Sequence, residues 1–188
     1  MTLILRFPTV MPVDSIPLIG ALSVARSIHS QFEIDSRVRW PNDVVVKGSK
    51  VAGLIAEGHQ QGDSLKFVLL GIGVNANFRS YEIRDRKIDA ATLMDLNGGT
   101  VDSPRLVCNI LLELEGLLSH ATLDPNLPLE LLRMRNDSTG RKVKIVTEDQ
   151  TIEGVFVDYQ SLDAVVVDSN VGRVILPAAS AILVEYPG

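Results

Sequence analysis

Between Arg37 and Val74 the chain alternates β-branched runs with short turns. A first run ends at Trp40, because Pro41 cannot donate a ladder hydrogen bond and the Asn-Asp pair that follows it is typical of turns. Two further turn signals, Lys47-Gly48-Ser49 and Gln60-Gln61-Gly62-Asp63, separate the later runs. Parallel strands need a crossover of a dozen or more residues, so this succession predicts antiparallel pairing.

Helical periodicity flanks these predicted strands. After a short strand over Thr2–Phe7, Asp14 or Ser15 can cap a helix that ends around residues 30–33, and Ser103-Pro104 is a good start for a second long helix. The apolar positions that recur at helical spacing are Leu18, Ala21, Leu22, Ala25, Ile28 and Phe32 in the first helix, and Leu106, Val107, Ile110, Leu114, Leu117, Leu118 and Ala121 in the second. Leu129–Arg135 is expected to form a third, shorter helix, and residues 89–93 a site loop that leads into a short one.

The character of the chain changes after Ser138-Thr139-Gly140. Short β-rich segments then follow at regular spacing, which indicates a small barrel. We therefore predict an α+β fold with two domains. Residues 1–138 form a mixed or antiparallel sheet covered by helices, and residues 139–188 form an SH3-like barrel.

Composition limits the function classes. The 188 residues are 46% hydrophobic with a net charge of -5, which gives no electrostatic footprint for nucleic acid or an anionic membrane. Arg6, Pro8 and Pro12 interrupt the apolar start, so neither a signal peptide nor a membrane span is indicated there. The single cysteine, Cys108, suits a reducing compartment, and the cytoplasm is the expected location.

Three short strings occur in a fixed order in the predicted antiparallel region. They are Arg39-Trp40-Pro41-Asn42-Asp43, Lys50-Val51-Ala52-Gly53 and Gly71-Ile72-Gly73-Val74-Asn75. In order and spacing they resemble the KWPND, KLAG and GIGIN strings of the biotin protein ligase catalytic domain. Gly140-Arg141-Lys142-Val143 is similar to the entry of that family's C-terminal barrel, so the resemblance extends along the whole chain.

The resemblance implies an adenylate-forming ligase that uses ATP, biotin and Mg²⁺. Biotin and ATP would give biotinyl-AMP and pyrophosphate, and a lysine amine of a carrier protein would then attack the adenylate. Lys50 would stabilise charge near the biotin carboxylate and the α-phosphate, Arg39 would assist at the phosphates, and Asp43 would hold magnesium or nucleotide. The other positions that match the nucleotide- and biotin-binding part of the family pattern are Trp40, Asn42, Ala52, Gly53, Gly73 and Asn75.

Two departures from the family pattern stand out. The family's Gly-Arg-rich loop and its Ser-Thr-Asn segment precede the position that is Met1 here, so we expect the sequence to be the back part of such an enzyme. Arg39 stands where lysine is usual, which keeps the charge but replaces a compact ammonium with a planar fork.

Each residue also has an ordinary interpretation. Taken alone, Lys50 is a solvated strand-end lysine, Asn42-Asp43 is a turn signal, and Trp40 packs beside the site. Cys108 fits the apolar side of its helix as a structural residue. Gly71 and Gly73 resemble part of a dinucleotide fingerprint, but no third glycine supports that interpretation. His29, His59 and His120 lack metal-ligand spacing.

Alternatives to a biotin–protein ligase are a non-catalytic module that keeps the ligase-like fold for binding or regulation, and a lipoate-type ligase. A biotin carboxyl carrier protein is the expected partner, together with a separate N-terminal ligase subunit that would restore activity to this chain. Exposed apolar residues, expected at Val51, Leu54 and Ile55, and an edge strand over residues 3–5 also predict association, including a homodimer.

Overall fold

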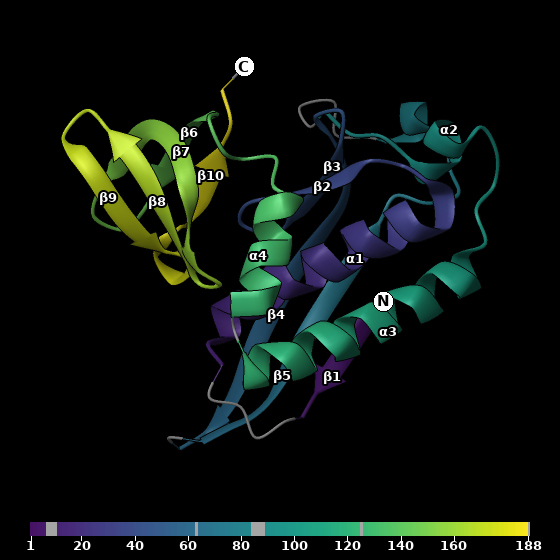
Figure 1. Ribbon diagram of the computed structural model, residues 1–188, viewed down its shortest axis with the longest axis horizontal. Helices are drawn as coiled ribbons and strands as arrows, with labels where there is room; N and C mark the ends of the chain where they lie inside the picture. Colours follow the sequence, from purple (N-terminus) through teal and green to yellow (C-terminus); the bar gives the residue numbers. More distant parts are fainter. Residues whose placement is uncertain (7–10, 63, 84–88, 125, 188) are drawn as a thin grey trace.

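Two antiparallel sheets and the helices around them make up the computed structural model (Figure 1). It describes residues 1–6, 11–62, 64–83, 89–124 and 126–187. The α+β class predicted from the sequence is confirmed, and every strand pair within the two sheets is antiparallel.

The first sheet has five strands in the order β1-β5-β4-β3-β2. Their bounds are Thr2–Leu5 for β1, Ser36–Arg39 for β2, Asp43–Val46 for β3, Ser49–Gln61 for β4 and Ser64–Val74 for β5. The turn at Lys47-Gly48 falls where the sequence predicted it, and both residues adopt the positive φ that a tight hairpin turn requires. At the second predicted turn, Gln60 and Gln61 belong to β4 instead, and Asp63 lies outside the described residues. Phe7, the expected end of the first strand, lies outside the described residues.

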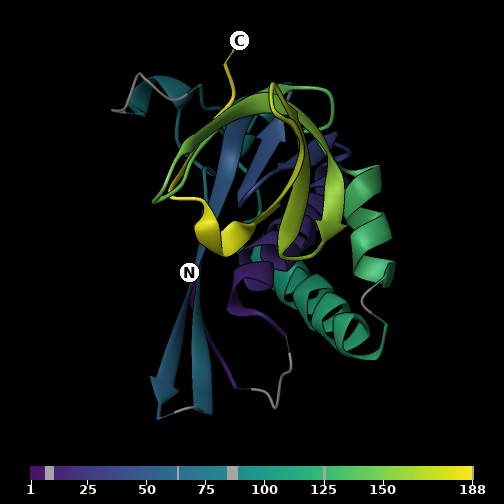
Figure 2. The same cartoon turned by 90° about the vertical axis from the view of Figure 1, so that its left-hand side faces the viewer.

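Helices cover one face of this sheet (Figure 2). The chain forms α1 at Ile16–Phe32, α2 at Leu93–Asn97, α3 at Ser103–Leu123 and α4 at Asn126–Met134, with short 3-10 turns at Val13–Ser15, Ser80–Glu82 and Ala178–Ser180. Packing between α1 and β4 is close at Gly20, where an added Cβ would lie 2.7 Å from Leu54 Cδ2. The apolar stripe predicted for the first helix therefore forms much of the core.

The helix starts differ from the prediction at three places. Ser15 precedes α1, but its hydroxyl donates to the Pro12 carbonyl and accepts no cap hydrogen bond. Asp102, one residue before the predicted cap of α3, accepts from the Arg105 N–H. The fourth helix begins at Asn126 rather than Leu129, because Pro128 is tolerated in a first turn whose N–H groups have no helical partner.

Two predictions of surface exposure were wrong. Val51 and Leu54 are buried, whereas Ile55 is 62% exposed. A register shift between Val44 and Val45 lies opposite this part of β4, and Leu54 faces α1, so only Ile55 of the three turns to the uncovered side. Cys108 lies on the exposed side of α3 and is not part of the core.

By length and mean hydropathy alone, α3 could cross a membrane, a test that helices of soluble proteins also meet. Here its buried residues pack against α1, and Glu113 forms an ion pair with Arg26 of α1 at 2.6 Å. These contacts hold α3 against α1 in the layer of helices over the first sheet.

The second sheet follows a linker after α4, near the boundary that we place at Ser138. Its order is β10-β6-β7-β8-β9. The strands span Lys142–Val146 (β6), Thr151–Ser161 (β7), Ala164–Ser169 (β8), Gly172–Pro177 (β9) and Leu183–Glu185 (β10). Phe156 and Tyr159 fill its interior. The expected closed barrel is not confirmed, since no pairing joins β9 to β10 in the described residues.

Candidate active site

Strand register brings the three strings of the sequence into one row across the sheet. Arg39 of β2 lies opposite Asp43 of β3, Asp43 lies opposite Gly53 of β4, and Gly53 lies opposite Gly73 of β5. Residues directly opposite each other in antiparallel strands point to the same face. Residues up to 34 positions apart in the sequence thus share one line on a single face, as Arg39 and Gly73 do.

Lys50 reaches into this row. Its Nζ lies 2.5 Å from Asp43 Oδ1, with the two side chains 33% and 25% exposed. The buried Oδ1 forms no hydrogen bond within the described residues, so the contact with Lys50 is an ion pair whose atoms are not aligned for a hydrogen bond. A partly buried cation beside a carboxylate can shift toward an anionic ligand, since it remains solvated on one side.

Gly53 makes room for this ion pair. A Cβ at that position would lie 2.9 Å from Lys50 Cε, 3.0 Å from Lys50 Nζ and 3.3 Å from Asp43 Oδ1. Distances near 3.0 Å are closer than carbon atoms pack in proteins, so a side chain here would displace the lysine. The structure thus identifies the Lys50 side chain as the group that approaches Gly53.

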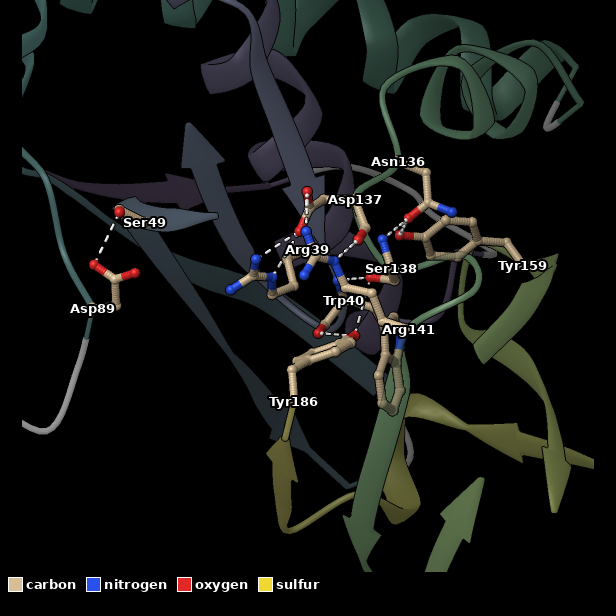
Figure 3. A network of polar contacts seen from close by, with 10 residues as sticks. All are labelled: Arg39, Trp40, Ser49, Asp89, Asn136, Asp137, Ser138, Arg141, Tyr159 and Tyr186. Atoms are coloured by element: carbon tan, nitrogen blue, oxygen red, sulfur yellow. Dashed lines mark hydrogen bonds and ion pairs between the residues drawn. The ribbon is translucent and has the colours of Figure 1, made fainter. Parts of the chain in front are cut away.

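A second segment crosses beside Lys50. The Lys50 N–H donates to the Asp89 carbonyl at 2.8 Å, and the Ala91 N–H donates to the Lys50 carbonyl at 2.9 Å. Ser49 Oγ donates to Asp89 Oδ1 at 2.9 Å (Figure 3). These bonds confirm that residues 89–93 form a loop beside this row, which leads directly into α2.

Asn42 and Asn75 hold the backbone around the row. Asn42 Nδ2 donates to the Leu54 carbonyl at 2.6 Å, and the Leu54 N–H donates back to the Asn42 carbonyl at 3.0 Å. Asn75 Nδ2 donates to the carbonyl oxygens of Ala91 at 3.2 Å and Lys50 at 3.3 Å. Both amides therefore fix the positions of strand β4 and the neighbouring loop.

Trp40 and Ala52 are buried and support the sheet from within. Trp40 is 1% exposed, and its ring centroid lies 6.3 Å from that of Phe156 in β7. The interpretation of Trp40 as a packing residue is confirmed. Neither side chain presents a surface to solvent, so ligand contact by these two residues would have to use the backbone.

Arg39 turns away from the row toward the linker. Its Nε and Nη2 donate to Asp137 Oδ2 at 2.9 and 2.6 Å, and the two side chains are only 17% and 11% exposed. The guanidinium carbon also lies 5.4 Å from the centroid of the Tyr186 ring. Asp137 and Tyr186 carried no signal in the sequence, because each is an isolated residue far from the three strings.

Ser138 and Tyr186 complete a polar network around the end of β2 (Figure 3). Ser138 Oγ accepts from the Trp40 N–H at 3.0 Å, and the Tyr186 hydroxyl donates to the Trp40 carbonyl at 2.8 Å. Burial raises the pKa of Tyr186 above its ordinary value, so its phenol stays protonated and able to donate. The network joins the linker and the C-terminal residues to the strand that carries Arg39.

One carboxylate oxygen in this row is a candidate ligand for a metal ion. Asp43 Oδ1 is buried and lacks a hydrogen bond, but it lies in the ion pair with Lys50, so a metal ion would have to take the place of Lys50 Nζ there. Mg²⁺ in nucleotide sites is commonly held by one or two carboxylates together with phosphates and water. No group of three or more His, Cys, Asp or Glu side chains converges in the part of the chain that the structure describes. The donor set fits an ion that arrives with a nucleotide rather than one held by protein ligands alone.

Comparisons with known proteins agree with this geometry. The sequence profile of the biotin/lipoate A/B protein ligase family matches residues 10–75, which include Lys50 and the whole row. The bifunctional ligase/repressor BirA of Bacillus spizizenii is 34% identical over 116 residues, which are 60% of this chain and 35% of that protein. Over these residues the chain resembles the biotin/lipoate A/B protein ligase family.

A second curated relative matches more of the chain. The biotin–[acetyl-CoA-carboxylase] ligase of Mycobacterium tuberculosis is 28% identical over 151 residues, which are 79% of this chain and 53% of that protein. The chain thus spans about a third to a half of the length of these curated relatives.

Solved structures show the same fold. The apo biotin protein ligase of Aquifex aeolicus superposes with a TM-score of 0.86 at 21% identity, covering 99% of this chain and 81% of that one. The same ligase in complex with biotin and ATP gives a TM-score of 0.82 at 22% identity, covering 99% and 77%. At this identity the likeness establishes the fold.

Proposed function

We propose that this chain carries the adenylation site of a biotin–protein ligase. In the first step a carboxylate oxygen of biotin attacks the α-phosphorus of ATP, and pyrophosphate leaves. In the second step a lysine amine of a carrier protein attacks the carbonyl carbon of biotinyl-AMP, AMP leaves and the amine loses a proton. Both steps redistribute negative charge at phosphate oxygens, which fixed cations stabilise.

The observation that supports this function most strongly is the Lys50–Asp43 pair over Gly53. It brings a cation and a carboxylate to a sheet position without a side chain, where a ligand could lie close to the backbone. We propose that Lys50 stabilises charge between the biotin carboxylate and the α-phosphate. Asp43 would hold Lys50 in the free protein and face magnesium or the nucleotide when ATP is bound.

The remaining roles follow from position. Arg39 stands at the end of the row and would contact phosphate. Gly53 and Gly73 would form the floor against which biotin packs, and Ala52 and Trp40 would support that floor. We propose that Asn42 and Asn75, whose amides bind backbone carbonyls, act at the nucleotide by fixing β4 and the loop at Ala91.

Partners and location are also part of this proposal. A biotin carboxyl carrier protein is the expected acceptor in the cytoplasm. A separate N-terminal ligase subunit and a second copy of the chain are further proposed partners. Exposed Ile4 of the edge strand β1 and exposed Ile55 of β4 support such pairing.

The test measures single-turnover formation of biotinyl-AMP at a high micromolar concentration of the chain. Pyrophosphate release is the readout. We expect Lys50→Ala to lower the rate about a hundred- to a thousandfold, as for removal of one charge-stabilising group. Lys66→Ala, at an exposed position in β5, is the matched control and should leave the rate unchanged. Adding a separate N-terminal ligase subunit should raise the wild-type rate.

Three outcomes would contradict the proposal. If the wild type released no pyrophosphate in response to biotin, with or without that subunit, the non-catalytic module would be favoured. Release that depends on lipoate and not on biotin would favour the lipoate-type ligase. A Lys50→Ala variant as active as the Lys66→Ala control would remove the assigned role of Lys50.

A further inference from the structure

The backbone and the side chain of Arg39 point to different parts of the structure. By strand register it stands opposite Asp43, at the end of the row that carries the proposed site. Its guanidinium is nevertheless bound through Nε and Nη2 to Asp137 of the linker, at 2.9 and 2.6 Å. An arginine fork that holds a carboxylate in this way cannot offer the same two N–H groups to a phosphate.

Asp137 can lose Arg39 without becoming an unpaired buried charge. Its second oxygen, Oδ1, accepts from Arg141 Nη2 at 3.0 Å, and Arg141 Nε donates to the Asp137 carbonyl at 2.6 Å. A buried carboxylate without any partner would be costly. Because Arg141 remains in place, release of Arg39 leaves Asp137 with a charge-assisted hydrogen bond.

The surroundings leave space for the exchange. A cavity of about 410 Å³ lies beside the pair and is lined by Lys47, Gly48, Asp137 and Arg141 among others. Arg39 Nη2 is 3.9 Å from the position that a Cβ would take at Gly48, so this turn adds no side chain against the guanidinium. Leaving Asp137 would also cost the guanidinium its contact with the Tyr186 ring, whose centroid lies 5.4 Å from the guanidinium carbon.

We propose that Asp137 is a positioning residue that competes with the phosphates of the nucleotide for Arg39. This inference rests on the proposed function, because it assumes that ATP binds over the row. In the free protein Asp137 holds Arg39, and the apparent ATP affinity is reduced by the fraction of molecules in which Arg39 is occupied. Nucleotide binding then moves Arg39 to the phosphates, while backbone hydrogen bonds from Val38 to Arg135 and from Asp137 to Val38 keep the linker on β2.

The competition predicts a gain of affinity when the carboxylate is neutralised. We expect Asp137→Asn to bind ATP about three- to tenfold more tightly in isothermal titration, because a neutral amide oxygen is a weaker acceptor for Arg39. Arg39→Ala should weaken binding, and adding Asp137→Asn to Arg39→Ala should give no gain. Asp168→Asn removes a carboxylate from another Asp–Arg pair, with Arg173, and is the matched control.

These measurements separate the inference from the proposed function. The proposed competition would be overturned if Asp137→Asn bound ATP with an affinity equal to or weaker than that of the wild type. It would also be overturned if Asp137→Asn still raised the ATP affinity in the Arg39→Ala background. Either result leaves the proposed function standing if wild-type ATP binding depends on Lys50. Absence of wild-type ATP binding, both with and without the N-terminal ligase subunit, would overturn the proposed function, and the competition with it. Matching unfolding curves would exclude misfolding of Asp137→Asn.

Discussion

At the scale of single residues, Gly53 is the position where a methyl group should matter most. Gly53→Ala would push Lys50 away from Asp43, because the new Cβ meets the flexible end of the lysine. We expect biotinyl-AMP formation to fall at least about tenfold while the free energy of unfolding changes by less than about 1 kcal/mol. Gly99→Ala, whose Cβ meets no atom within 4 Å, is the control. Unchanged adenylation in Gly53→Ala would contradict the role of this ion pair.

The sequence revealed only part of this site. Lys50, Asp43 and Gly53 were predictable because they occur in short strings whose order matched a family, and strand register then brings them together. Asp137 could not be predicted, because its contact with Arg39 joins residues 98 positions apart. The hydrogen bonds from the Asn42 and Asn75 side-chain amides to backbone carbonyls could not be predicted either, because they depend on the three-dimensional fold.

At the scale of elements, the antiparallel order was predictable from turn length, whereas burial within β4 was not. The register shift after Val44 places both Val51 and Ala52 in buried positions, which breaks the simple alternation of a strand. Helix starts were also missed, because several adjacent polar residues can cap a helix equally well by type. Residue spacing alone does not decide between Asp102 and Ser103.

A glycine in β7 tests the second sheet. A Cβ at Gly154 would meet the carbonyl oxygen and backbone carbon of Asp168 in the paired strand β8, where no flexible group can move aside. We expect Gly154→Ala to lower the free energy of unfolding by about 1 to 3 kcal/mol, measured in urea. Gly172→Ala is not a suitable control because of its positive φ, so Gly99→Ala, whose Cβ meets no atom within 4 Å, serves instead. Equal stability of the two variants would contradict this strand register.

At the scale of the whole molecule, two buried tyrosines connect separate parts of the chain. The Tyr159 hydroxyl donates to Asn136 of the linker at 3.4 Å, and the Tyr186 hydroxyl donates to the Trp40 carbonyl at 2.8 Å. Burial raises the pKa of Tyr159 and Tyr186 above the ordinary value of 10.0. A folded-state pKa above the unfolded one contributes stability below pH 10, and that stability is lost as the pH rises through the folded pKa. We expect the free energy of unfolding to fall between about pH 10 and 11 and to fall less steeply in Tyr186→Phe. A flat profile in the wild type would contradict this.

Association is a second property of the whole molecule. Exposed Ile4 of the edge strand β1 and exposed Ile55 of β4 predict self-association or binding of another chain. We expect sedimentation at high micromolar concentration to show species larger than the monomer, and Ile55→Lys to reduce them. A strictly monomeric wild type that remains soluble without a partner would contradict this prediction.

The central claim is that biotinyl-AMP forms over the row from Arg39 to Gly73. The most direct test is a crystal structure with a non-hydrolysable biotinyl-adenylate analogue. We expect its phosphate-equivalent group within hydrogen-bond distance of Lys50 Nζ and its biotin part against Gly53. An analogue that binds instead in the cavity at Lys47 and Arg141, with the Lys50–Asp43 ion pair unchanged, would contradict the account.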